Sequence, residues 1–252
     1  MGPGRFFVKR ILGFMLLVCL ALPGLPALAA PRLAAQASAW QFARQRAQGR
    51  VVELANRWTG LEASWAPTMP GPTLLLGLQV TLPAGDTGAR ALQFAREIAD
   101  LWGVPPAELA VLSVVRSKAR VSVRIQQQVA TPHGAVPVLD RDLVVTLDGD
   151  SRVISVTSDL LATVLPATVP CAEAVAQQAA LRAALGLRAD TAVTFAQLRQ
   201  IQLSKLAIVA TPAGARLVWA VDVLADPLRD RRAVVVDAAT GQVVGQRQVA
   251  QH

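Results

Sequence analysis

The sequence of 252 residues has few of the side chains from which most catalytic sites are built. It contains two histidines, His133 and His252, and two cysteines, with neither an H-E-x-x-H zinc motif nor a G-x-S-x-G nucleophile motif. A phosphate-binding glycine loop and a dinucleotide-binding fingerprint are also missing. The usual ligands of a catalytic or structural zinc site cannot be assembled from this set. The inventory therefore predicts a protein that is not an enzyme, has no catalytic residues and holds no metal or cofactor.

Aromatic residues are also scarce, at 4% of the chain, and tyrosine is absent. Proteins that bind single-stranded nucleic acid use aromatic side chains as stacking platforms for the bases. The formal net charge is +8, but the basic residues are spread along the whole chain. Net charge of this kind does not by itself indicate nucleic acid. We therefore expect a protein partner and no nucleic acid.

Residues 1–29 have the features of a cleavable signal peptide. Three cations in the first ten residues precede an apolar run over Ile11–Leu22, and Ala27-Leu28-Ala29 has the small side chains that signal peptidase reads. The run is shorter than the about 20 residues of a membrane-spanning helix, although an uncleaved anchor is the alternative. We expect cleavage before Ala30 and a secreted protein, periplasmic or extracellular, without a stable membrane anchor. Cleavage removes three cations and no acid, which leaves +5 of the formal +8.

Cleavage also removes Cys19, so the mature chain has one cysteine, Cys171, and no internal disulfide is expected. Cys171 follows Pro170 at the start of a predicted helix, a position that can activate a thiol. A nucleophile pair of Cys171 with His133 is therefore conceivable. The two residues fall in different predicted domains, however, so an unreactive cysteine is the simpler interpretation.

The mature chain divides into a helical segment and two small domains, and its fold class is α+β. Residues 30–69 are rich in alanine, glutamine and arginine and end in a proline-rich stretch, which predicts a helix followed by a linker. The domains are placed at residues 70–160 and 168–252, with a linker over Leu161–Pro170 between them. Each domain is expected to pack a helix on an antiparallel sheet.

Apolar residues at three- and four-residue spacing predict one helix in each domain. The first begins at Asp86 or Thr87, runs to Trp102 and buries Ala91, Phe94, Ala95, Ile98 and Leu101. The second covers Ala172–Leu185, with Val175, Ala179, Leu181 and Leu185 near one face. A glycine stops each helix. Alternating polarity and turn residues predict the strands Thr73–Leu82, one or two within Leu109–Val129, Val136–Leu139, Leu143–Leu147, Val153–Thr157, Leu203–Ala210, Arg216–Leu224, Arg232–Asp237 and Gln242–Val249.

Four cations form the strongest predicted surface feature: Arg116, Lys118, Arg120 and Arg124. Their spacing would place them on one face of a strand, while Val121, Val123 and Ile125 would occupy the other. A solvated outer face of a sheet is the simpler explanation. The functional interpretation is a docking surface for an acidic partner protein.

Two stretches resemble the pro-region of thermolysin-like metallopeptidases. The first domain is similar to the fungalysin/thermolysin propeptide domain, through a glutamine-containing strand at Gln126–Val129, the segment His133–Val138 and the hairpin Asp142–Val156. The second is similar to a PepSY domain, through Leu217-Val218-Trp219-Ala220-Val221-Asp222-Val223 and Val236-Asp237-Ala238-Ala239-Thr240-Gly241-Gln242-Val243. The matches cover about residues 73–249. They depart from the pattern at Asp140-Arg141, where glycines are common, and by one extra residue after Gly134.

The resemblance implies a role but no catalytic residues, because the zinc ligands of such precursors belong to a peptidase domain that does not follow His252. In those precursors the pro-region assists folding of the peptidase and occupies its cleft. We therefore expect a secreted, propeptide-like inhibitor and/or folding chaperone whose partner is a thermolysin-like zinc metallopeptidase. The alternatives are an extracellular scaffold or binding module, or the orphaned pro-region of a split precursor.

The C-terminal segment Gly245–His252 is the second predicted partner-binding region, through Gly245, Gln246, Arg247, Gln248, Val249 and His252. In a covalent precursor this end leads into the peptidase, so the resemblance implies a position near the catalytic cleft. The segment is polar and lacks proline, and we expect a flexible tail that lies in the cleft as an extended strand. The four cations would steer docking in a salt-dependent manner. A disordered chain end is the alternative.

Overall fold

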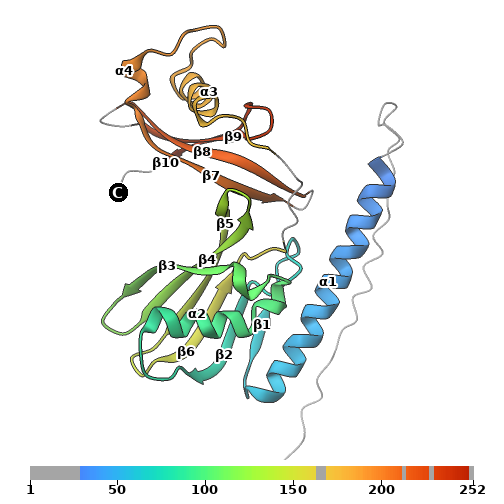
Figure 1. Cartoon of the computed structure of the whole chain (residues 1–252). Helices are drawn as coiled ribbons and strands as arrows, with labels where there is room; N and C mark the ends of the chain where they lie inside the picture. The colour runs from blue at the N-terminus through green and yellow to red at the C-terminus, as the bar shows by residue number, and fades with distance from the viewer. Residues whose placement is uncertain (1–28, 163–168, 212–213, 227–229, 250–252) are drawn as a thin grey trace, which may run out of the picture.

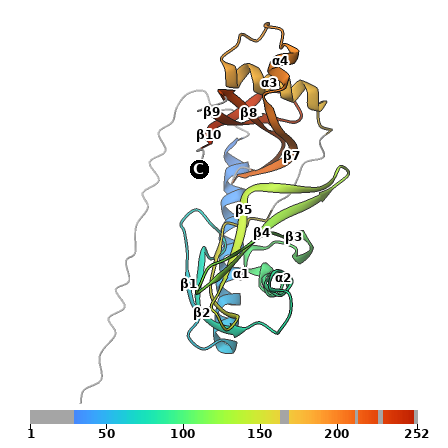
Figure 2. The same ribbon diagram turned by 90° about the vertical axis from the view of Figure 1, so that its left-hand side faces the viewer.

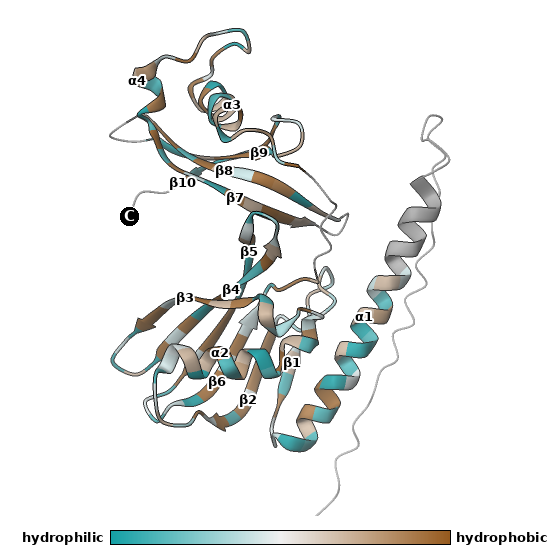
Figure 3. Cartoon of the chain, in the orientation of Figure 1, coloured by the Kyte–Doolittle hydropathy of each residue, from teal (hydrophilic) through white to brown (hydrophobic). Residues whose placement is uncertain are grey.

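The computed structural model describes residues 29–162, 169–211, 214–226 and 230–249. Nearly all of the predicted signal peptide, residues 163–168 of the predicted linker and His252 lie outside them. The fold class is α+β, as the sequence predicts: helices pack on a large, mostly antiparallel sheet (Figure 1). Hydrophobic and hydrophilic positions are interspersed along the strands (Figure 3), so each part of the sheet has a core-facing side.

The first part of the sheet has the strand order β1-β2-β6-β5-β4-β3, and all neighbours are antiparallel. Helices α1 and α2 and two short 3-10 helices accompany it. Their core contains Ile98, Val123 and Val145, which are fully buried. The elements are α1 (Ala29–Arg57), β1 (Glu62–Ser64), β2 (Leu74–Thr81), α2 (Thr87–Glu97), η1 (Ala99–Trp102), η2 (Pro106–Glu108), β3 (Leu109–Arg116), β4 (Val121–Thr131), β5 (Gly134–Leu147) and β6 (Arg152–Ser158).

The first predicted helix is present but is divided in two. Asp86 caps α2, because its side chain accepts a hydrogen bond from the Ala89 amide (2.7 Å). All five residues expected in the core are buried there. The α-helix ends at Glu97, and the chain continues as η1 up to Gly103, whose left-handed φ of 67° stops it. The predicted end near Trp102 is therefore correct, although the last turn is tighter.

Helix α1 confirms the predicted helix in the N-terminal segment and packs on the first core. Leu54 and Trp58 are buried, and the ring centroids of Trp58 and Phe94 lie 5.8 Å apart. An ion pair between Arg50 and Asp100 (2.9 Å) joins α1 to η1. Although α1 has 29 residues, neither it nor another helix in the described part of the chain is long and apolar enough to cross a membrane.

The second part of the sheet has the order β7-β8-β9-β10, also antiparallel. Helix α3 covers one of its faces (Figure 1). All four strands match predicted ones. The elements are α3 (Glu173–Leu185), α4 (Phe195–Leu198), β7 (Ile201–Thr211), β8 (Gly214–Asp226), β9 (Asp230–Asp237) and β10 (Val243–Val249).

The predicted inner face of α3 is partly wrong. Val175 is 51% exposed, while Ala176, Ala180, Leu181 and Ala184 are buried against the sheet. Alanines at four-residue spacing let the helix approach the sheet closely. The free energy gained by this close packing is larger than the gain from burying the valine side chain instead. Arg232 of β9 fixes the helix end by donating to the Ala184 carbonyl (2.6 Å). Its hydrogen bond to Asp230 raises the pKa of the Arg232 guanidinium above its ordinary value.

The two parts of the sheet are joined, whereas the sequence suggests two separate sheets. Strand β5 is one continuous strand rather than two, and Val138 pairs with Ile208 of β7 in parallel. A third cluster of buried residues surrounds this junction. Arg141 spans it, since its guanidinium donates to the carbonyls of Asp159 (3.0 Å) and Ala210 (2.9 Å). Figure 2 shows β5 rising from the first part of the sheet toward β7. The predicted domain boundaries stay a prediction.

Candidate partner-binding surfaces

The four predicted cations do not lie along one strand. Arg116 is the last residue of β3, Lys118 and Arg120 lie in the turn that follows, and Arg124 lies within β4. The turn is closed by a hydrogen bond from the Ser117 amide to the Arg120 carbonyl (2.8 Å). The prediction of a single basic strand face is therefore wrong, because the alternation in sequence runs through a hairpin turn.

The hairpin also places Arg116 and Arg124 on opposite faces of the sheet. Arg116 pairs with Val121, on the face that α2 covers, and donates to the Thr87 hydroxyl (3.1 Å). Arg124 lies on the other face and forms an ion pair with Asp142. Arg116, Lys118 and Arg120 are all exposed and form the end of the hairpin. We name these three residues the basic tip.

The predicted C-terminal tail is an ordered strand over most of its length. Gly245–Val249 belongs to β10 and pairs with β9 from Val235 to Arg231. The strand predicted over Gln242–Val249 is confirmed, and the flexible tail is wrong for these residues because β9 offers a complete antiparallel partner. Strand β10 is at the end of the sheet order, so one of its edges has no partner strand within the described ranges. His252 lies outside the described residues.

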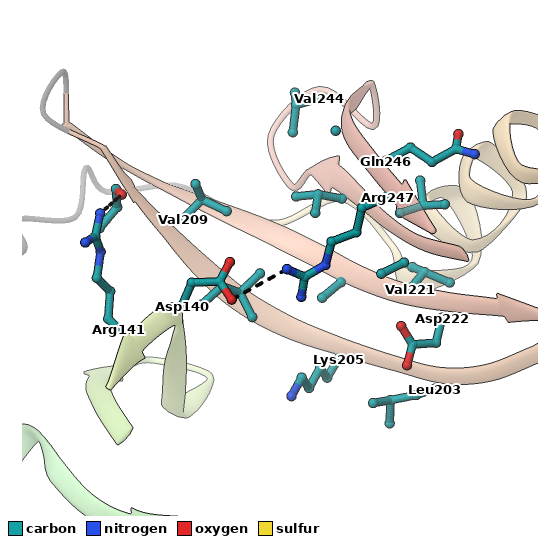
Figure 4. A pocket seen from close by; sticks show the side chains of 17 residues that line it. Asp140, Arg141, Leu203, Lys205, Val209, Val221, Asp222, Val244, Gln246 and Arg247 are labelled. Atoms are coloured by element: carbon teal, nitrogen blue, oxygen red, sulfur yellow. Dashed lines mark hydrogen bonds and ion pairs between the residues drawn. The ribbon is translucent and has the colours of Figure 1, made fainter. Parts of the chain in front are cut away.

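A groove crosses the face of β7–β10 that α3 leaves uncovered (Figure 4). It has a volume of about 650 Å³. Two cross-strand rows form its floor, and Leu139–Arg141 of β5 stands at one end. The middle strands place the small side chains of Ala220 and Ala233 on the floor, and Gly245 of the outer strand β10 has no side chain, so the sheet is hollowed around them. The rows are Leu203, Asp222, Ala233 and Arg247, and Lys205, Ala220, Val235 and Gly245.

The groove carries charges of both signs, with cations in excess. Asp140, held at a positive φ of 54°, points toward Arg247 across the groove, and their ion pair is 3.7 Å long (Figure 4). Asp222 is held by a shorter ion pair, of 2.6 Å, with Arg231. Lys205 is exposed and forms no ion pair with any residue that the structure describes.

The structure gives the pair Cys171 and His133 no common site. His133 is exposed in the turn between β4 and β5. Cys171 is half-buried before α3, where its carbonyl accepts a hydrogen bond from the Trp219 indole (3.2 Å). Within the described ranges, no group of three or more His, Cys, Asp or Glu side chains is placed to hold a metal ion.

Sequence reasoning placed Gly245, Gln246 and Arg247 in a binding region but missed the groove that they line. A signal was present: β8, β9 and β10 each have an alanine or glycine on the uncovered face. Ala220 and Ala233 lie beside Val221 and Val234, which are buried under α3. Small residues on an uncovered face leave a hollow, but only the strand register aligns them across the sheet.

Comparison with known proteins shows a distant structural similarity. No protein-family model and no curated protein matches the sequence. Among solved structures, the chain is similar to the Bacillus megaterium YpeB C-terminal domain, with a TM-score of 0.40 and 11% identical residues. This similarity covers 81% of the chain and 96% of the YpeB domain.

Proposed function

We propose that this protein is a secreted, non-catalytic, propeptide-like partner of a thermolysin-like zinc metallopeptidase, which it inhibits or helps to fold. The observation that carries the proposal is the groove on the uncovered face of β7–β10, which ends at the rim formed by β10. An open groove with a small-residue floor suits a polypeptide segment of another protein.

The sequence resemblance to a PepSY domain also supports the groove on β7–β10 as the binding site. Its two quoted stretches fall on β8 and on β9 with the turn that follows. Strands β8 and β9 supply the centre of the groove floor, including Ala220 and Ala233. The C-terminal strand of such a domain leads toward the peptidase in a covalent precursor, and here that strand, β10, forms the rim.

The basic tip is expected to raise the rate at which the protein associates with its partner. Arg116, Lys118 and Arg120 are exposed, and no acidic residue occurs between Leu109 and Ile125. Exposed charge of one sign accelerates the encounter with an oppositely charged protein surface, and salt weakens this effect. We expect association with an acidic peptidase to be slower at high ionic strength.

The test mixes the chain from Ala30 onward with a purified thermolysin-like peptidase and follows cleavage of a fluorogenic peptide. The refolding yield of the denatured peptidase is measured in parallel. We expect inhibition, a higher refolding yield, or both. Ala233→Leu should remove the effect by filling the groove floor. Ala89→Leu adds the same three carbon atoms at an exposed position of α2 and should leave the effect unchanged.

The proposal is contradicted if a large excess of the protein changes neither proteolysis nor refolding yield. In that case the extracellular scaffold or binding module becomes the better description. Equal loss of effect in both leucine variants would show that the groove is not the contact surface.

A further inference from the structure

We propose that the groove selects an extended polypeptide segment with acidic side chains, one held by Lys205 at one side of the floor and another by Arg247 at the other. The inference rests on the proposed function only for the identity of the partner protein. It depends on three features of the groove: its shape, the lysine Lys205, which has no ion pair with a described residue, and the long ion pair between Arg247 and Asp140.

The shape of the floor suits an extended segment with small or branched apolar side chains. Four strands spaced about 4.8 Å apart give a floor about 14 Å across, which four or five extended residues span. Ala220 and Ala233 on the middle strands and Gly245 on the outer strand β10 leave this floor hollow, and Val235 adds apolar surface. The volume of about 650 Å³ falls within the range of pockets that enclose small ligands or short peptide segments.

Two cations flank this floor. Lys205 lies on β7 at one side, and Arg247 lies on β10 at the other. Lys205 forms no ion pair with a described residue, so its ammonium can bind an incoming carboxylate without first breaking a contact. A carboxylate that approaches Lys205 within the groove is partly shielded from water, which strengthens the attraction.

Arg247 can leave Asp140 and bind a carboxylate of the ligand with little loss of free energy. Its ion pair with Asp140 is 3.7 Å long, and the two side chains are 70% and 76% exposed. Exposed pairs of this length contribute little to stability. Asp222, in contrast, stays neutralised by Arg231 at 2.6 Å and does not repel the ligand strongly. The charges therefore favour an acidic segment over a basic one.

Fluorescence anisotropy with defined peptides tests the inference. The probe is a labelled, C-terminally amidated heptapeptide of alternating valine and glutamate, and the matched probe has glutamine in place of glutamate. We expect the glutamate peptide to bind at least about tenfold more tightly, a difference that shrinks at high salt. Lys205→Gln and Arg247→Gln should each reduce the difference, since each removes one of the two cations, and Ala233→Leu should abolish binding of both peptides.

The control is Arg188→Gln, which removes an exposed cation outside the groove and should bind like the unaltered protein. Each variant is checked for an unchanged thermal unfolding midpoint. Equal affinity for the two peptides, no binding of either, or equal effects of Arg188→Gln and Lys205→Gln would overturn the inference.

The outcomes for the groove and for the proposed function are separable. Acid-selective peptide binding without any effect on a peptidase would refute the metallopeptidase partner and support the groove. Inhibition of a peptidase that survives Lys205→Gln and Arg247→Gln would support the partner and refute the acidic segment.

Discussion

Trp219 connects two buried clusters, and its removal is the sharpest test of the packing. The side chain lies on β8, packs against the cluster under α3 and also against the cluster at the β5–β7 junction. Its indole donates a hydrogen bond to the Cys171 carbonyl (3.2 Å). Trp219→Ala therefore removes apolar contacts on both sides and leaves that carbonyl without its donor.

The expected cost follows from partial burial. Full truncation of a buried tryptophan costs about 3–5 kcal/mol, and Trp219 is half-buried, so the lower end, about 3 kcal/mol, applies. For a chain of this size that corresponds to a fall of about 6–12 °C in the unfolding midpoint. Trp219→Phe keeps a ring but loses the indole donor, and it should cost about 1–2 kcal/mol.

Urea unfolding followed by far-ultraviolet circular dichroism measures these costs, since the substitution alters the fluorescence signal itself. Phe195→Ala is the control, because Phe195 is an aromatic residue of the same part of the chain but 73% exposed; it should shift stability by less than about 0.5 kcal/mol. If Trp219→Ala unfolds within a degree or two of the unaltered protein, the packing described for β8 is refuted.

Four further outcomes are expected. The chain from Ala30 onward should hydrolyse neither protein nor ester substrates, and Cys171→Ser should leave partner binding unchanged; activity that copurifies with the chain and is lost in this variant would restore the cysteine nucleophile. Arg141→Ala, which loses two carbonyl partners at the junction, should cost about 1–3 kcal/mol in urea unfolding, with Arg188→Gln as the control. The isolated fragment 168–252 should fold but melt below the full chain, because Ile208 and Leu217 lose their cover from β5; melting at the same temperature would argue against this junction. Replacing the basic tip with glutamines should slow association with an acidic peptidase and flatten its salt dependence in stopped-flow measurements, and an unchanged rate would exclude steering by these residues.

The sequence predicts most of the elements because their signals are local. The Asp86 cap, the apolar spacing of α2 and the glycine at Gly103 define one helix, and alternating polarity defines the strands of both parts of the sheet. The fold class follows from this order of elements. Local signals also explain the error in α3, since the larger Val175 outweighs alanine in a sequence pattern, whereas close packing on the sheet favours Ala176 and Ala180.

The candidate site depends on pairings between distant residues, which local patterns do not reveal. The turn at Ser117–Arg120 reverses the chain and separates Arg116 from Arg124, although their spacing suggests one face. The groove needs Ala220, Ala233 and Gly245 to fall in two adjacent cross-strand rows, and those rows are set by the register of β8, β9 and β10. The strand register cannot be predicted from any single segment, and neither can the position of Leu139–Arg141 of β5 at one end of the groove.

Hydrogen exchange of the chain, measured by mass spectrometry with and without a bound thermolysin-like peptidase, tests the central claim most directly. The claim is that the uncovered face of β7–β10 is the contact surface for a partner peptidase. The account predicts slower exchange in β10 and along β7 when the peptidase is present, and unchanged exchange in α3 and α1. Protection confined to α1 or α3, or no protection at saturating peptidase, would contradict it.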